Sequence, residues 1–466
     1  MRWHSLYHGI AAASLLVVAG LAPLADRDEP RYAQAVREMR ASGNLFIPTN
    51  FGQLRADKPI LIYWLQLAST TLVGENELGF RLPSLLALGL WIWITAQLAR
   101  KLRESPCWAL VPGMALAGVF CTPDALVSAL TAASLLAFVA GIRGEKAVAV
   151  VLGWGLCGLG VLAKGPVTPL FLFPCLVGLC WNEKGLWRRV FHPLGPTLAL
   201  GLVALWFVPA NLATGWELAR IALGRHVVQR ALQPLEGHGI AGLPGVLAGP
   251  PFYLASLAVA SFPLIPGLFR FFTEKRHQDP RLFRLVALGL GVPLLVLCLV
   301  QTKLPHYVLP ALPLVVVAAR PTLRASASAA LGSTLLALAF LVLSATTPYR
   351  AAGRAVATLP APALAFPMQE PSLRYYAGAK LVLREVFDPS FCFLLLREGE
   401  ESRLPAADRE KLQLHQAFSG WNLAKGRRET LRLYRLASDR AGTVKPGPGG
   451  SVAESATGFG RIFAAK

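Results

Sequence analysis

Charge is scarce in this chain of 466 residues, and negative charge is the scarcest. Charged residues make up 15% of the sequence, against about 25% in an average soluble domain. The hydrophobic residues, 54% of the chain, do not alternate with polar ones as the cores of a soluble protein would require. They gather in runs of roughly 17–22 residues, the length that crosses about 30 Å of hydrocarbon. The composition therefore excludes an ordinary soluble enzyme and predicts a membrane protein.

Several motifs that identify common chemistries are also missing. The seven cysteines form no Cys-x-x-Cys pair and mostly lie in or beside apolar runs, so we expect neither a disulfide framework nor a cysteine metal site. No Walker loop is present, which argues against nucleotide-driven chemistry. No internal repeat is apparent.

Positive charge is plentiful, because 46 Lys and Arg against 26 Asp and Glu give a formal net charge of +20. Binding of nucleic acid would need these residues on one soluble surface. They lie instead in short clusters between apolar runs, as expected for topology charge and attraction to anionic lipid. We therefore expect membrane lipids, and no nucleic acid, as partners.

The apolar runs predict an all-α polytopic membrane domain over residues 1–346, with about eleven transmembrane helices. The predicted spans are 6–25, 78–98, 106–122, 125–142, 147–163, 166–181, 192–213, 251–272, 284–301, 306–320 and 327–346. The first run is interpreted as an uncleaved span, because its apolar core is longer than that of a signal peptide.

Alternate loops hold the basic residues, and these loops are predicted to face the cytoplasm. The basic residues are Arg100, Lys101, Arg103, Arg143, Lys146, Lys184, Arg188, Arg189, Lys275, Arg276, Arg281, Arg284, Arg320 and Arg324. The long loops 26–77 and 214–250, and the tail, should then face outward.

Loop 26–77 and the tail both contain predicted structure. Residues 29–41 have helical periodicity and end at Gly43, and the apolar segment 59–73 predicts a helix in the membrane interface with Tyr63 and Trp64 at headgroup level. Residues 347–466 predict a small α/β domain with a flexible end. Its predicted strands are 380–387, 390–396 and 430–436, and the flexible segment begins at Lys445.

Charged residues near the ends of spans are costly to keep there and require an explanation. The predicted topology places a set of them on the outer face: Asp28, Glu29, Asp57, Lys58, Asp124, Lys164, Lys303 and His306. One explanation is that they are interfacial side chains reaching for water. The presence of carboxylates on the same face favours a site. Carboxylates can accept a proton from an attacking hydroxyl and cations can bind a departing phosphate, which points to a polyprenyl-phosphate sugar donor.

At these residues the sequence resembles the aminoarabinose lipid A transferase and the protein O-mannosyltransferases of the GT-C glycosyltransferase superfamily. The resemblance covers about residues 5–320. Its motifs are Asp28-Glu29-Pro30-Arg31-Tyr32, Asp57-Lys58-Pro59, Phe80-Arg81-Leu82-Pro83-Ser84, Asp124, Lys164-Gly165-Pro166 and Lys303-Leu304-Pro305-His306-Tyr307. The segment Ser372-Leu373-Arg374-Tyr375-Tyr376 is a softer match to the start of the family's C-terminal part.

The resemblance implies an inverting sugar transfer from undecaprenyl phosphate or a similar carrier, at the periplasmic face of a bacterial inner membrane. Asp28 would be the catalytic carboxylate, with Glu29 as its rival and Asp124 as a second acidic residue of the cavity. Lys58 would contact the donor phosphate. Further candidate phosphate ligands are Arg31, Lys164, Lys303, His306 and Arg225, of which Arg225 could equally lie on a solvated helix face.

Other features of the function stay open. The acceptor is a lipid A-like molecule, a glycan or a protein, and the sugar is equally undetermined. A divalent cation could lie near the carboxylates, but the sequence offers no dedicated ligand set, so we expect no essential cofactor. We expect a monomer. The alternative function is a transporter or flippase of a lipid-linked sugar, which would also gather charges in a membrane cavity.

Overall fold

The computed structural model describes residues 2–103, 109–144, 146–234, 239–274, 279–368, 370–384 and 386–436. The predicted flexible segment from Lys445, and the basic residues Lys275 and Arg276, lie outside these ranges.

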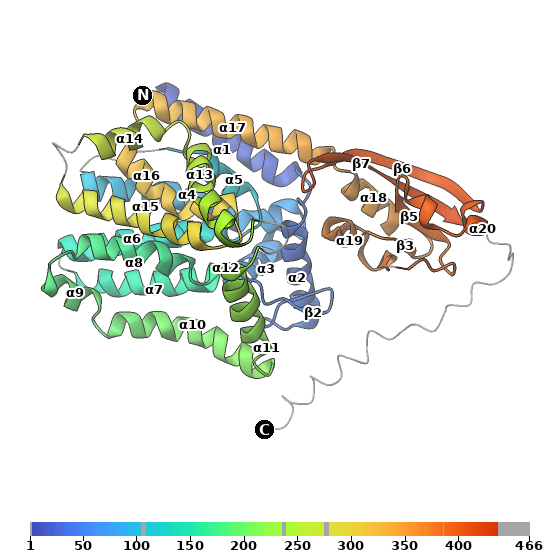
Figure 1. Cartoon of the computed structure of the whole chain (residues 1–466), viewed down its shortest axis with the longest axis horizontal. Helices are drawn as coiled ribbons and strands as arrows, with labels where there is room; N and C mark the ends of the chain where they lie inside the picture. The colour runs from blue at the N-terminus through green and yellow to red at the C-terminus, as the bar shows by residue number, and fades with distance from the viewer. Residues whose placement is uncertain are drawn as a thin grey trace.

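Mostly apolar helices, long and short, lie side by side and form most of the molecule (Figure 1). They are α1 (Arg2–Leu21), α4 (Glu77–Arg103), α5 (Pro112–Val119), α6 (Asp124–Gly144), α7 (Ala147–Lys164), α8 (Val167–Leu179), α9 (Lys184–Val190), α10 (Leu194–Ala213), α13 (Gly242–Ser261), α14 (Ile265–Thr273), α15 (Pro280–Leu299), the 3-10 helix η3 (Pro305–Ala311), α16 (Leu312–Ala319) and α17 (Leu323–Ala345). Seven helical segments among the described residues are long and apolar enough to cross a membrane, and α1, α8 and η3–α16 are shorter apolar segments. The protein is a multi-pass membrane protein, and the count of about eleven spans stays a prediction.

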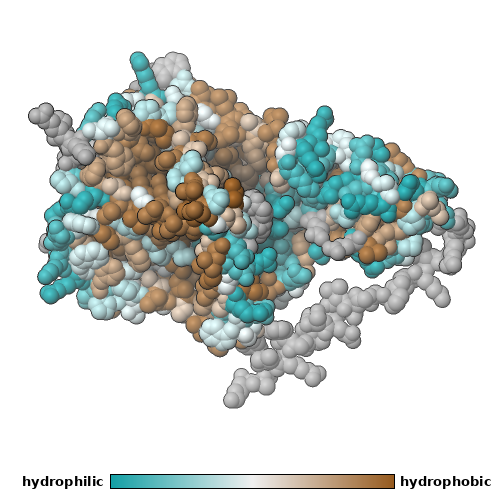
Figure 2. Space-filling view, in the orientation of Figure 1, coloured by the Kyte–Doolittle hydropathy of each residue, from teal (hydrophilic) through white to brown (hydrophobic). Residues whose placement is uncertain are grey.

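The surface of this helical part agrees with a membrane setting. Apolar side chains cover its middle, and polar ones gather at the end that includes α9 and over the C-terminal strands (Figure 2). Leu200, Leu205, Leu254 and Val259 are among the exposed apolar residues. An apolar band between two polar ends is what a bilayer would cover.

Two predicted spans were placed wrongly. Within the described residues, predicted span 106–122 contains only the short helix α5, which Pro112 begins and the extended Phe120 ends. Predicted span 251–272 is two helices, because α13 starts earlier, at Gly242, and Phe262-Pro263 separates it from α14. Proline lacks the N–H that would continue the helix, so a long apolar run does not guarantee one helix.

The loop between α1 and α4 folds into two helices and a small hairpin. Helix α2 (Asp28–Ser42) confirms the predicted helix, and Gly43 ends it with a left-handed φ of 69°. Strands β1 (Thr49–Asn50) and β2 (Gln53–Leu54) pair before α3 (Leu61–Val73).

Tyr63 of α3, which was predicted to lie at headgroup level, faces protein. The Tyr63 side chain is fully buried, and its hydroxyl accepts a hydrogen bond from Nε of Arg55 at 2.7 Å. Its ring lies 5.5 Å from that of Tyr32 in α2. Helix α3 therefore packs this face against protein, whereas the sequence pattern alone cannot distinguish a lipid-facing apolar side chain from a protein-facing one.

Predicted loop 214–250 is largely helical. It contains α11 (Glu217–Ala219), the π-helical segment η1 (Arg220–Gln229), α12 (Arg230–Leu232) and the start of α13. Helix α11 adjoins the end of α10, and η1 and α12 lead from it to the segment after α15, at the end of the bundle where α2 is found (Figure 1).

Beyond that end of the bundle lies a five-stranded sheet with order β4-β3-β5-β7-β6 (Figure 1). Strand β3 is parallel to β4 and β5, and β7 is antiparallel to β5 and β6. The elements are α18 (Pro348–Ala357), β3 (Ala363–Ala365), α19 (Pro371–Ala377), η4 (Gly378–Lys380), β4 (Leu381–Leu383), β5 (Phe393–Arg397), η5 (Glu400–Arg403), α20 (Ala406–Arg409), β6 (Leu412–Asn422) and β7 (Arg427–Leu436). The predicted strands overlap β4, β5 and β7, whereas β3 and β6 were not predicted.

The arrangement of basic loops generates a test of orientation. Arg143 donates to the carbonyl oxygen of Lys101, and Arg281 pairs with Glu183, so these loops meet at one end of the bundle. Reporter fusions after residue 103, 188 or 324 should therefore indicate cytoplasm, and fusions after 230 or 400 should indicate periplasm. A cytoplasmic report from position 400 would contradict the predicted orientation.

Candidate active site

Two cavities open at the end of the bundle next to α2, with volumes of about 670 and 690 Å³. Each is lined mainly by apolar side chains, such as Phe120 and Phe252 in the first and Phe171 and Phe207 in the second. Both cavities are also lined by one set of mostly polar residues: Asp57, Lys58, Asp124, Lys164, His226, Arg230, His306 and Tyr307. We call this set the shared wall. It brings together five of the charged or titratable residues that the sequence had placed on the outer face, namely Asp57, Lys58, Asp124, Lys164 and His306.

The turn at the start of α6 and the end of α7 provide one half of the shared wall. Asp124 is the first residue of α6 and Lys164 the last of α7, and these neighbouring helices place the two side chains in an ion pair. Thr122 donates a further hydrogen bond of 2.8 Å to Asp124. The Lys164 Nζ lies 5.7 Å from the ring centre of Tyr307, whose hydroxyl accepts a bond from Arg230 at 3.2 Å.

The segment before α3 provides the other half. Asp57 lies 3.1 Å from the Arg55 guanidinium and 3.8 Å from Lys58 Nζ. Burial by itself would raise the pKa of Asp57, but the positive charges of Arg55 and Lys58 outweigh it and hold that pKa at about 2. Burial also lowers the pKa of the Lys58 ammonium, an effect that Asp57 opposes. An anionic ligand at Lys58 would stabilise its charged form.

Asp28 and Glu29 lie next to each other in the sequence but in opposite surroundings. The Asp28 side chain is 66% exposed, lines the first cavity but not the second, and lies 3.9 Å from Arg31. Glu29 is 1% exposed. Both residues line the first cavity, but the Asp28 carboxylate is by far the more accessible of the two to a bound molecule.

Glu29 is held by a buried ion pair with Arg81 of α4. Its carboxylate accepts four hydrogen bonds, two from Arg81 and one each from the backbone N–H of Ala25 and Cys121. Arg81 also donates to the carbonyl oxygens at the end of α1 and just beyond it, those of Ala19, Ala22 and Pro23. This pair fixes the backbone on both sides of Asp28 and favours a positioning role for Glu29.

Two residues predicted to bind phosphate do not line either cavity. Lys303 is buried and donates to the carbonyl oxygens of Leu297, Cys298 and Val300, where it closes the end of α15. Arg225 is exposed on η1. In contrast, Arg31 lines the first cavity, and Lys58, Lys164 and His306 line both.

Some important residues were not assigned a role from the sequence. Arg81 appeared only within a motif, although a charged residue inside an apolar run requires a partner and this signal could have identified it. Arg55 and Tyr307 gave no comparable signal, because their roles depend on contacts with distant segments.

Among the residues that the structure describes, no group of three or more His, Cys, Asp and Glu side chains is arranged to hold an ion. The expectation that no cation is essential stays a prediction.

Comparison with known proteins gives a consistent result. A family model described as dolichyl-phosphate-mannose-protein mannosyltransferase matches residues 57–212. A relative from Pseudomonas paraeruginosa (strain PA7), named undecaprenyl phosphate-alpha-4-amino-4-deoxy-L-arabinose arabinosyl transferase, is 31% identical over 324 residues, which are 64% of this chain and 57% of the relative. A relative of the same kind from Sodalis glossinidius is 28% identical over 338 residues, 66% of this chain and 57% of its own.

The fold is also similar to a solved structure, ArnT from Cupriavidus metallidurans bound to undecaprenyl phosphate. The TM-score is 0.73 at 18% identity, over 95% of this chain and 99% of that one. The predicted resemblance to the aminoarabinose lipid A transferase and to the protein mannosyltransferases is confirmed. The chain spans less than two thirds, 57%, of the length of the two curated relatives.

The buried Arg81–Glu29 pair generates a prediction about stability. Arg81→Met should lower the free energy of unfolding by about 3–5 kcal/mol, because it leaves the Glu29 carboxylate buried without its partner. The measurement is thermal unfolding of purified protein in detergent.

The matched control is Arg220→Ala, which breaks an exposed pair with Glu217 and should change stability little. Adding Glu29→Gln to Arg81→Met should recover part of the loss, since the unpaired charge is then removed. An Arg81→Met protein as stable as wild type would show that the pair does not hold these segments.

Proposed function

We propose that the protein transfers a sugar, with inversion, from a polyprenyl-phosphate carrier to an acceptor at the periplasmic side of the membrane. The main support is that two largely apolar cavities meet at the shared wall, which includes the cations Lys58, Lys164 and Arg230. A lipid-linked donor needs an apolar chamber for its chain and cations for its phosphate, and a second chamber lets an acceptor reach the same point.

The donor fits best in the second cavity, with its phosphate at the shared wall. The lining from α7, α8 and α10 is apolar and suits a prenyl chain. Lys58, Lys164 and Arg230 then provide positive charge for the phosphate. These charges also stabilise the negative charge that grows on the phosphate as the sugar leaves.

Asp28 is the carboxylate best suited to act as the base. Asp57 is paired with cations that hold its pKa low, and Asp124 is bonded to Lys164 and Thr122. Glu29 already accepts four hydrogen bonds, and Asp26, which also lines the first cavity, is half-buried and accepts two from Ser372. Asp28 faces the first cavity, where the acceptor would lie. Because an ionised aspartate is a weak base at neutral pH, it must act by position.

The reaction then has a balanced course. An acceptor oxygen attacks the anomeric carbon of the sugar from the side opposite the carrier. The bond between that carbon and the carrier phosphate oxygen breaks, and its electron pair stays on the phosphate. The acceptor proton passes to Asp28.

The relatives' names suggest which substrates to test first. They are described as transferring 4-amino-4-deoxy-L-arabinose from undecaprenyl phosphate. We propose that donor with lipid A as the acceptor, and a glycan or a protein as the alternative acceptors. A hexose on the same carrier is the alternative donor, and the protein is proposed to act as a monomer.

Removing the base should stop the reaction without removing the donor. Asp28→Asn should lower the transfer rate at least about 100-fold, since a positioned base supplies that much or more. Mass spectrometry of lipid A incubated with undecaprenyl phosphate-linked aminoarabinose and purified protein measures transfer. Binding of undecaprenyl phosphate should remain.

Two variants separate the explanations. Glu29→Gln should reduce transfer less than Asp28→Asn, and Glu217→Gln, on the exposed surface, should leave it unchanged. Near-wild-type turnover of Asp28→Asn with an inactive Glu29→Gln would move the base to Glu29. If Asp28→Asn and Glu29→Gln both remained active, another base would be required.

The positive charge of Lys58 in the shared wall generates a prediction about the affinity for undecaprenyl phosphate. Lys58→Ala should weaken binding of undecaprenyl phosphate about tenfold or more, because a hydrogen bond to a charged group contributes about 1.5–3 kcal/mol. Lys58→Arg should restore it only in part, because a planar guanidinium does not replace a point charge. Arg225→Ala is the matched control and should bind normally. Unchanged affinity in Lys58→Ala would remove Lys58 from the site.

A further inference from the structure

The segment that ends at Asp28 is held from outside the bundle by α19. Residues 22–27 join α1 to α2 and have no regular structure. The N–H of Leu24 donates to the Tyr376 hydroxyl at 2.9 Å. Asp26 accepts two bonds from Ser372, one from its N–H at 2.8 Å and one from its hydroxyl. Two contacts thus connect this short segment to a helix more than 300 residues later in the chain.

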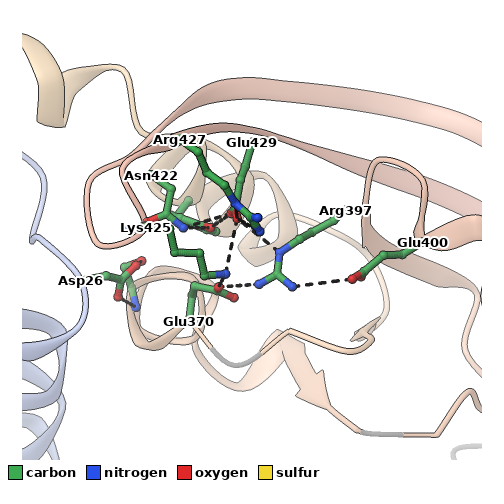
Figure 3. A network of polar contacts seen from close by, with 10 residues as sticks. Asp26, Glu370, Arg397, Glu400, Asn422, Lys425, Arg427 and Glu429 are labelled. Carbon is green, nitrogen blue, oxygen red and sulfur yellow. Dashed lines mark hydrogen bonds and ion pairs between the residues drawn. The ribbon is translucent and has the colours of Figure 1, made fainter. Parts of the chain in front are cut away.

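Helix α19 is in turn fixed to the C-terminal sheet. Glu370, directly before α19, pairs with Arg397 of β5 and with Lys425 between β6 and β7, the latter at 2.7 Å (Figure 3). Lys425 also lies 3.4 Å from Glu429 of β7. A side chain in such a network of charges loses freedom of movement. The network therefore holds the start of α19, where Ser372 lies, in place.

The bundle holds the same segment from the other side. Glu29 accepts from Ala25, and Tyr376 donates to Glu77 of α4 at 3.1 Å. Asp26 lies beside Glu370 in Figure 3, where a side chain from the bundle end meets the sheet network. Asp28 therefore lies between two carboxylates that are held in place. Asp26, two residues before it, is held by the C-terminal part, and Glu29, the next residue, is held by Arg81.

We propose that Ser372 and Tyr376 are positioning residues for the transfer reaction. By holding Asp26 and Leu24, they fix the direction in which Asp28 enters the first cavity. This proposal rests on the proposed role of Asp28 as the base. A base that works by position loses rate steeply when it is displaced, even when its own chemistry is intact.

The experiment compares Ser372→Ala, Ser372→Thr and Tyr376→Phe in the full-length purified protein. Ser372→Ala and Tyr376→Phe should each lower kcat about tenfold, because a small displacement of a reacting group costs this much or more. The affinity for undecaprenyl phosphate should not change, since neither residue lines the first or the second cavity. Ser372→Thr keeps the hydroxyl and should restore kcat. The assay uses undecaprenyl phosphate-linked aminoarabinose and lipid A.

The matched control is Ser419→Ala, which removes a hydroxyl bonded to Thr430 on the same sheet, away from residues 22–28. It should leave kcat unchanged. A loss of kcat in Ser419→Ala equal to that in Ser372→Ala, or no rescue by Ser372→Thr, would show a purely structural effect and overturn the proposal. If Ser372→Ala does not fold, the result for Tyr376→Phe decides.

Asp28→Asn, assayed in parallel, separates the two hypotheses. Wild-type turnover of Ser372→Ala and Tyr376→Phe with an inactive Asp28→Asn would overturn the positioning role alone. An active Asp28→Asn would overturn the base assignment, and the positioning proposal with it.

Discussion

A buried ion pair between Glu29 and Arg81 sets the geometry at the active end of the molecule. It joins the end of α1, the start of α2, the first turn of α4 and the backbone of Cys121, which lies just before α6. Separating these two charges inside the bundle would leave each without compensation, so the four segments hold their places together. Asp28 adjoins one partner of the pair and Asp124 follows Cys121 closely. The positions of both carboxylates therefore depend on it.

The fold was predictable where a local pattern decides the structure. Helix α2 follows from its periodicity and from Gly43, and most spans follow from the length of their apolar runs. The start of α13 was not predictable in this way, because its first ten residues include several glycines and prolines that usually mark a loop. The burial of Tyr63 was not predicted, for a different reason. Its neighbours come from α2 and Arg55, and hydropathy does not show whether an apolar side chain will contact lipid or protein.

The candidate site was predictable to the extent that helix ends fix positions. Asp124 and Lys164 end neighbouring spans on one face, so their meeting follows from topology. Lys303 also follows the end of a span, but its ammonium donates to free carbonyl groups of α15 and does not point into either cavity. The sequence does not show that these carbonyl groups would bind it. Arg81 and Ser372 act on residues 52 and 346 positions away. Without a contact pattern, such pairings cannot be read from one sequence.

The wall common to both cavities has a consequence for the order of events. Because each cavity has its own apolar lining and the two have the shared wall in common, carrier and acceptor can occupy different cavities. Under the proposed function both molecules occupy the protein at once, which corresponds to a sequential kinetic scheme without a covalent sugar–enzyme intermediate. In that scheme the spent carrier would leave from the second cavity and the glycosylated product from the first.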